Sequence, residues 1–186
     1  PRQDPDIIMV GAIRDLETAR HAIQASLTGH LVFATLHTND AAGAVTRLMD
    51  LGAEHFLLAS TLSGLVAQRL VKKVCEGCRV ERDLEPHEIE TISAALPDDH
   101  AGAVVSPFGT GCVDCRHAGY VGRSAIYELC EVTDPVQQLI MERADAGRVK
   151  AAARREGMLT LREAAVRKML AGVTSYEQVV AVTQAD

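Results

Sequence analysis

Two pairs of cysteines constrain this chain more than any other feature. Cys75 and Cys78 form one Cys-x-x-Cys clip, and Cys112 and Cys115 form a second clip with the same spacing. Four thiolates in two clips are the ligand set of a closed tetrahedral zinc site. The alternatives are redox chemistry at each clip or a disulfide framework of the kind found in small secreted proteins. The repeated spacing, in 186 residues with five cysteines and no signal peptide at the start, favours structural zinc.

A site with four sulfur ligands has no open position, so we expect the metal to hold structure and not to catalyse. Reduced cysteines also predict an intracellular protein. Cys130, the fifth cysteine, lies in a predicted strand over Arg123–Glu131, and we expect it to be a small buried hydrophobic side chain. Glu128 in the same strand is expected to face solvent.

The composition excludes several classes of protein. Hydrophobic residues make up 47% of the chain, with three Tyr, three Phe and no Trp, so the core must be aliphatic. The net charge of −6 argues against a general nucleic-acid binder, which needs a basic face. No apolar run is long enough to span a membrane. The longest, Phe56–Val71, is interrupted by polar residues and is predicted to be a buried helix.

A basic cluster near the C-terminus has no interleaved aromatic residues, so it is interpreted as a solvated helix face and not as a nucleic-acid site. Its members are Arg148, Lys150, Arg154 and Arg155.

The first 52 residues alternate between predicted strands and helices. Ile7–Val10 is a continuous apolar run, typical of a strand buried on both faces. Asp15 is a plausible N-cap for a helix that Gly29 stops. A second strand, Leu31–Leu36, is followed by a polar turn in which Thr38 or Asn39 would cap the next helix. This order predicts a parallel βαβ unit.

In such a unit a ligand binds beyond the carboxyl ends of the strands, here residues 11–14 and 35–38. Pro1 stands where a natural chain begins with methionine, and a strand follows within six residues. We therefore expect a fragment that starts inside a domain.

The rest of the chain is predicted to contain more helix than strand. Glu85–Leu96 is expected to be a short helix. From Thr133 onward the pattern is helical, with Pro135 in a first turn. Thr160 to Glu163 and Ser175 to Gln178 have the spacing of capping boxes, and Gly172 is expected to separate the last two helices.

Three motifs, and one further stretch that follows the last of them, together resemble one family. Arg2–Gly11 followed by Ile13–Asp15 resembles the Walker B region of the secretion ATPases, the hexameric motors of type II secretion and type IV pilus assembly. Gly29–Ala41 resembles their histidine box, and the two cysteine clips are similar to their tetracysteine metal site. Gly119–Glu128 matches the stretch that follows that site. The similarity covers essentially the whole chain, in the family's order.

The resemblance implies an α/β fold: the second half of a RecA-like parallel-sheet ATPase core, with an inserted small tetracysteine zinc subdomain and a helical C-terminal subdomain. The expected boundaries are 1–71 for the partial core, 72–122 for the zinc subdomain and 123–186 for the last strand and helices. The clips also imply the assembly and secretion branch, since the retraction branch lacks them.

The implied function is that of a cytoplasmic motor. Family members form hexamers, bind ATP and Mg²⁺, and dock on inner-membrane platform proteins, so membrane association would be peripheral and through partners. Two departures predict that this chain is itself inactive. The family's Gly-rich phosphate-binding loop would lie upstream of residue 1, and Ala12 stands where the family has Glu. A methyl group can neither help to hold magnesium nor orient the attacking water.

The Ala12 position is open to three explanations: an engineered Glu→Ala trap, a natural inactive copy and, least favoured, a sequencing or annotation accident. The motifs do not separate secretion from pilus assembly, which share them. The alternatives to a motor fragment are a non-catalytic zinc-containing docking module and a relative of DNA-uptake motors, although direct contact with nucleic acid is not expected.

The candidate nucleotide-site residues carry alternatives of their own. His37 is expected near the γ-phosphate, and the alternative is a turn histidine bonded to a backbone carbonyl. Gly11 and Thr38 are the other cofactor-binding candidates, and His30 is a structural or a functional residue with equal weight. Arg14 would pair with a carboxylate or reach phosphate across a subunit boundary. Asp15 is preferred as an N-cap over a metal ligand, and Arg2 is either at an interface or solvated.

Overall fold

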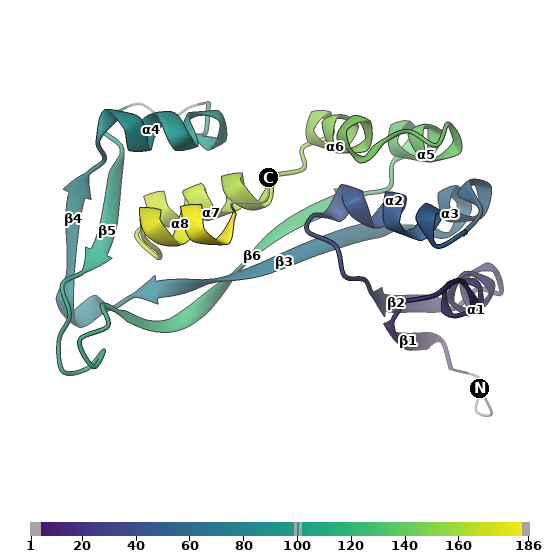
Figure 1. The fold of residues 1–186 in the computed structure, drawn as a ribbon, viewed down its shortest axis with the longest axis horizontal. Coiled ribbons are helices and arrows are strands. Elements are labelled where there is room, and N and C mark those ends of the chain that lie inside the picture. Colours follow the sequence, from purple (N-terminus) through teal and green to yellow (C-terminus); the bar gives the residue numbers. More distant parts are fainter. Residues whose placement is uncertain (1–4, 99, 101, 184–186) are drawn as a thin grey trace. The chain divides into compact units, whose positions relative to one another are not determined.

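The structure is a computed structural model that describes residues 5–98, 100 and 102–183. The chain divides into two compact units, each made of two stretches of sequence (Figure 1). Unit 1 contains residues 1–67 and 129–158, and unit 2 contains residues 68–128 and 159–186. Arg2 lies outside the described residues, so its predicted position is not assessed. The three-part division at residues 71 and 122 stays a prediction.

Unit 1 begins with the predicted βαβ unit. Strand β1 (Ile7–Ala12) pairs in parallel with β2 (Leu31–Thr35), and α1 (Leu16–Leu27) connects them. Helices α2 (Ala41–Asp50) and α3 (His55–Thr61) follow, and α5 (Asp134–Met141) and α6 (Ala146–Arg155) return to the same unit. Helix α5 packs on α3 and α6 packs on α2. The core of unit 1 lies where these helices meet.

The first two strands differ from the prediction of burial on both faces. Met9 is 83% exposed, and Ile7 and Phe33 are also exposed. Within the described residues this sheet contains only β1 and β2, and the side chains that alternate with these exposed ones are no more than half-buried. The prediction of the strands was correct, and the prediction of their burial was wrong.

The predicted helix Phe56–Val71 is wrong in its second half. Helix α3 ends at Thr61, and Leu62 already has an extended backbone. Strand β3 (Gly64–Val74) then begins and pairs with β6 (Tyr120–Glu131). Along β3, buried Leu65 and Ala67 flank exposed Val66, which is the period of two that a strand produces.

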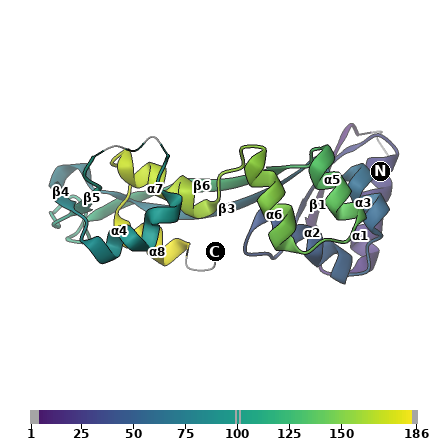
Figure 2. The same ribbon diagram turned by 90° about the horizontal axis from the view of Figure 1, so that it is seen from above.

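Unit 2 contains both cysteine clips. It also contains the last two helices, α7 and α8 in Figures 1 and 2. The first clip ends in a 3₁₀ turn (Glu76–Cys78) that leads into β4 (Arg79–Asp83), which pairs antiparallel with β5 (Val105–Gly109). Between these strands lie α4 (Pro86–Ile92) and a second 3₁₀ turn (Ser93–Ala95), close to the predicted helix Glu85–Leu96. Helices α7 (Leu161–Leu170) and α8 (Tyr176–Val182) pack against each other.

Several predicted helix signals have the expected geometry. The Asp15 carboxylate accepts a hydrogen bond from the Thr18 N–H (2.8 Å), and this bond lowers the pKa of Asp15. Thr160 and Glu163 form a reciprocal capping box at the start of α7. Gly172, with φ of 77°, ends that helix in the left-handed region. These signals are predictable because donor and acceptor lie within one turn of sequence.

Three local predictions were wrong. Asp40, not Thr38 or Asn39, caps α2, because its carboxylate accepts from the Gly43 N–H at 2.8 Å. Ser175 stands at the N-cap of α8, but its hydroxyl bonds the Tyr120 hydroxyl (2.8 Å) in place of the helix end. Glu128 is 0% exposed, because β6 turns it to the same side as buried Ile126 and Cys130.

Among the residues that the structure describes, no helix has the length and apolarity that a membrane crossing requires.

Candidate functional site

The four cysteines of the two clips come together in unit 2. Their Sγ atoms all lie within 4.8 Å of one another, and the Cys75–Cys112, Cys78–Cys115 and Cys112–Cys115 pairs are each 3.8 Å apart. A tetrahedral zinc with Zn–S bonds of about 2.3 Å requires sulfur atoms about 3.8 Å apart. Disulfide bonds would require sulfur atoms about 2.0 Å apart, and none of the five cysteines, all within the described residues, forms one. The donor set and its spacing therefore fit a metal such as zinc.

Backbone N–H groups surround the sulfur atoms. The N–H of Cys112 (3.1 Å) and the N–H of Gly119 (3.3 Å) donate to the Cys115 sulfur, and the Gly111 N–H donates to the Cys78 sulfur (3.3 Å). Gly111 and Gly119 both have positive φ, which turns the chain around the second clip. Such donors orient the ligands and compensate the negative charge that thiolates bring to the site.

N–H donors and burial shift the pKa values of the cysteines in opposite directions. The backbone bond from Cys112 is the main cause that lowers the pKa of Cys115 to about 6. Burial instead raises the pKa of Cys78 to about 11 and also raises that of Cys75. The N–H donors thus favour the thiolate at Cys115, whereas burial favours the neutral thiol at Cys75 and Cys78.

Cys130 stands apart from this cluster. It is fully buried in β6, as predicted for a small hydrophobic side chain, and it is not among the four clustered cysteines.

The carboxyl ends of β1 and β2 lie side by side in unit 1. In the parallel register Ala12 stands opposite Thr35, and the Ile13 N–H donates to the Thr35 carbonyl at 2.8 Å. An irregularity between Met9 and Ala12 shifts the register just before this point. The pairing brings Gly11, Ala12 and Arg14 to the same sheet edge as His37 and Thr38, which is the edge that the sequence predicted.

The turn after β2 is held by local polar contacts. The Thr38 hydroxyl donates to the Asp40 carbonyl at 3.1 Å. The Asp40 carboxylate caps α2 with one oxygen and accepts from the Lys150 ammonium of α6 with the other (3.5 Å). His37 and Arg14 are exposed at this edge. The turn is thus fixed at Thr38 and Asp40, while the His37 and Arg14 side chains are accessible.

His30 lies at the other end of β2. Its Nδ1 atom is 3.0 Å from the Ala25 carbonyl and 3.1 Å from the Thr28 hydroxyl, both at the end of α1. The structure therefore does not bring His30 together with His37, and the contacts of its ring are those of a residue that packs a turn.

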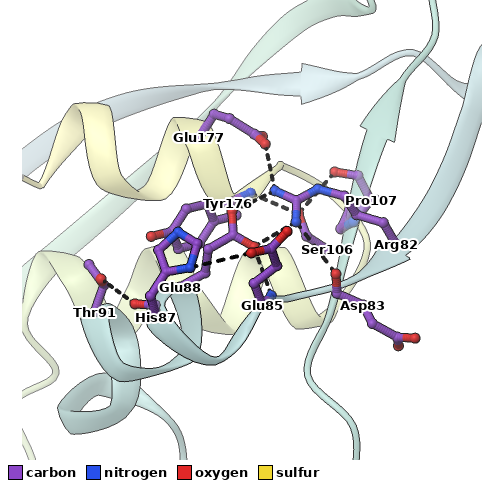
Figure 3. A network of polar contacts seen from close by, with 10 residues as sticks. All are labelled: Arg82, Asp83, Glu85, His87, Glu88, Thr91, Ser106, Pro107, Tyr176 and Glu177. Atoms are coloured by element: carbon purple, nitrogen blue, oxygen red, sulfur yellow. Dashed lines mark hydrogen bonds and ion pairs between the residues drawn. The ribbon is translucent and has the colours of Figure 1, made fainter.

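A polar network around Arg82 in unit 2 was not predicted from the sequence. Arg82 of β4 binds both carboxylate oxygens of Glu88 on α4, at 2.6 and 2.8 Å, and also binds Glu177 on α8 at 2.9 Å (Figure 3). The only local signal was Glu85-Pro-His-Glu88, where Glu88 also accepts from the Glu85 N–H. The contact to Glu177 spans 95 residues, and no sequence pattern marks it.

Known proteins resemble this chain over nearly its whole length. The family model described as "Type II/IV secretion system protein" matches residues 1–181. The type IV pilus assembly ATPase TfpB of Acinetobacter baylyi is 48% identical over 97% of this chain and 31% of its own length. The type II secretion system ATPase E of Vibrio cholerae is 46% identical over 98% of this chain and 35% of its own length.

Solved structures agree on the fold. The pilus retraction motor PilT with bound ADP has a TM-score of 0.63, with 25% identity over 97% of this chain and 40% of that chain. The ATPase DotB of Legionella pneumophila has a TM-score of 0.63 with 23% identity, over 100% of this chain and 40% of that chain. Both neighbours support the α/β fold class, and the clustered cysteines fit the tetracysteine subdomain.

The first curated relatives are much longer than the region they share with this chain, which spans about a third of their length or less. Because the family model matches 181 of the 186 residues of this chain, the chain belongs to the type II/IV secretion system protein family and corresponds to a C-terminal part of that family's secretion and pilus assembly ATPases.

Proposed function

We propose that this chain is the C-terminal part of a hexameric ATPase that powers type II secretion or type IV pilus assembly. The motor would be cytoplasmic and peripheral at the inner membrane, where platform proteins bind it. The relatives' names support the motor function, since they include type IV pilus assembly ATPases and type II secretion ATPases.

The observation that carries the proposal is the shared edge of β1 and β2. Parallel pairing of Ala12 with Thr35 brings two strand ends together, and ligands of parallel sheets bind at such ends. In the full-length motor, ATP and Mg²⁺ would lie between this edge and a phosphate-binding loop supplied from outside the chain. Gly11 and Thr38 would line the phosphates, and His37 would contact the γ-phosphate.

The remaining candidates have weaker support. Arg14 is exposed at the same edge and would pair with a carboxylate or reach phosphate in a neighbouring subunit. His30 lies at the far end of β2, with its Nδ1 against the Ala25 carbonyl, and these contacts favour a structural role.

Ala12 sets the expected activity of the chain. A carboxylate at this strand end could hold a magnesium ion and orient water, while the alanine methyl group offers no ligand atom. We therefore expect no ATP hydrolysis by the 186-residue chain. Its own complete site is the tetracysteine cluster, where Cys75, Cys78, Cys112 and Cys115 would hold one structural zinc ion.

ATP hydrolysis tests this proposal. The 186-residue chain and the full-length gene product are compared, each with Ala12 and with the Ala12→Glu substitution, by phosphate release at saturating ATP and Mg²⁺. We expect no turnover by the chain in either form and turnover by the full-length Ala12→Glu protein. In that protein His37→Ala should lower the rate, and His30→Ala serves as the matched control at the other end of β2.

Two outcomes would contradict the proposal. One is turnover by the isolated chain that His37→Ala abolishes, because the chain would then contain a complete active site. The other is a full-length Ala12→Glu protein that neither binds nor hydrolyses ATP.

A non-catalytic docking module is the second candidate, and the completeness of the cysteine cluster within this chain favours it. The module would bind zinc and a platform protein but no nucleotide. Zinc analysis, ATP titration calorimetry and a binding assay with purified platform components distinguish the two functions. ATP binding by the full-length protein excludes the module as the whole function.

A further inference from the structure

One short segment receives bonds from all the stretches that flank the cysteine clips. This segment, residues 172–178, runs from the end of α7 into the first turn of α8, and we name it the α7–α8 junction. Within it Thr174 and Ser175 are fully buried. All of its contacts described below lie within unit 2.

The stretch before the first clip binds the junction through its backbone. The N–H of Val74, the residue before Cys75, donates to the Val173 carbonyl at 3.0 Å. The Thr174 hydroxyl donates to the Lys72 carbonyl at 2.7 Å, and the Lys72 N–H donates to the Gln178 side chain at 3.2 Å. The end of β3 is therefore bonded to the junction at three points.

The stretch after the first clip binds the junction through arginines. Arg82 pairs with Glu177 while Glu88 holds the same guanidinium, as Figure 3 shows. The Arg79 guanidinium lies directly against Gly172, where even a Cβ atom would collide with it. Both arginines belong to β4, which begins at the residue after Cys78.

The second clip is flanked in the same way. Before it, the fully buried Ser106 hydroxyl of β5 accepts from the Tyr176 N–H at 2.9 Å (Figure 3). After it, the Tyr120 hydroxyl bonds the Ser175 hydroxyl at 2.8 Å. The junction thus has bonded partners on both sides of both clips.

We propose that the tetracysteine centre is the conformational anchor of helices α7 and α8: metal in the cluster orders the α7–α8 junction. The inference rests on the zinc site proposed above. Four ligands on one ion fix the two clips relative to each other, and hence fix their flanking stretches. Without metal the clips are held together only by hydrogen bonds, such as that from the Cys75 N–H to the Gly119 carbonyl (3.0 Å) and those between β4 and β5, so the partners of the junction are fixed less firmly relative to one another.

Hydrogen exchange measured by mass spectrometry tests the anchor directly. Zinc content is measured first, by elemental analysis of the purified chain. Exchange is then compared in zinc-loaded and chelator-treated protein. We expect amides of residues 172–182 to exchange at least about tenfold faster without zinc, the change that loss of one to two hydrogen bonds produces. Helices α5 and α6 of unit 1 should be unchanged and serve as the internal control.

Point variants separate the anchor from general loosening. Thr174→Val and Tyr120→Phe each remove one hydroxyl bond to the clip flanks, so they should raise junction exchange in the zinc-loaded chain while one zinc per chain is retained. Thr91→Val is the matched control, because the Thr91 hydroxyl bonds the His87 carbonyl within α4 and the substitution keeps the Thr91 carbonyl that accepts from Arg162 of α7.

Each other outcome overturns the anchor. If the chain binds zinc and its removal leaves junction exchange unchanged, the anchor is wrong and the metal site stands. If the chain binds no zinc, the metal site and the anchor both fail. If chelation accelerates exchange equally in α5, α6 and the junction, metal stabilises the whole chain and not this segment.

Discussion

Replacing Gly109 by alanine tests how closely β5 packs against Gly119, which follows the second cysteine clip. Gly109 is the last residue of β5, and a Cβ atom added there would overlap the backbone of Gly119. The Gly119 carbonyl accepts from the Cys75 N–H at 3.0 Å, and the Gly119 N–H donates to the Cys115 sulfur. The added methyl group must therefore push apart two stretches that both position metal ligands.

The expected cost follows from that overlap. The new carbon needs about 1 Å of backbone movement, which places the substitution at the upper end of overpacking effects, about 3 kcal/mol. Since the movement disturbs N–H groups that orient the thiolates, zinc affinity should fall about 10- to 100-fold. Urea unfolding of the zinc-loaded chain and competition with a chromogenic chelator measure the two effects.

Gly64→Ala is the matched control. Gly64 begins β3, and the nearest atom to its added Cβ is the Cys130 carbonyl oxygen at 3.6 Å, an ordinary contact. This variant should keep its zinc affinity and change stability by about 0.5 kcal/mol or less. Equal stability and equal zinc affinity of the two variants would refute the close packing of Gly109 on Gly119.

Three further predictions concern single side chains. Thr160→Ala should destabilise the chain by about 1 kcal/mol in thermal unfolding, because it removes the α7 cap, and Thr160→Ser should restore most of this. Glu88→Gln should lower the free energy of unfolding of the metal-free protein by about 1–2 kcal/mol at neutral pH. The Arg82 bond lowers the pKa of Glu88 to about 2, below its ordinary 4.5. The difference in free energy of unfolding between wild type and Glu88→Gln, measured in urea titrations, should therefore shrink as pH falls from 4.5 towards 2. A gap that stays constant over this range would argue against the ion pair. Cys115→Ser should abolish binding of one zinc per chain in elemental analysis, whereas Cys130→Ser should not, since Cys130 lies outside the cluster.

The fold could be predicted where its determinants are local. Asp15, Thr160 and Gly172 act within a few residues, so their roles were visible in sequence. Strand β4 was not predicted because its residues, Arg79–Asp83, carry four charges and no alternation of apolar side chains. It is a strand because β5 pairs with it in tertiary structure, a context that overrides local preference.

The candidate sites divide in the same way. The cysteine cluster was predictable because each clip sets its own ligand spacing, and only the meeting of the clips depends on the fold. The shared edge of β1 and β2 followed from the parallel βαβ order. The network around Arg82 was not predictable, since Glu88 and Glu177 reach it from separate helices, and neither helix carries a motif for a partner on β4.

The α7–α8 junction shows why continuity of sequence is a poor guide to the cooperative parts of this chain. Residues 72–122 form one stretch, but Lys72, Ser106 and Tyr120 each bond to residues of the junction. Bonds that join positions 55 to 106 residues apart are formed only after both partners are in place, so neither stretch can order its buried polar groups alone. Ser106, Thr174 and Ser175 are fully buried, and leaving any of them without a partner costs about 1–3 kcal/mol. A metal site that orders one stretch must therefore stabilise the other, which is the physical basis for expecting α7 and α8 to respond to zinc.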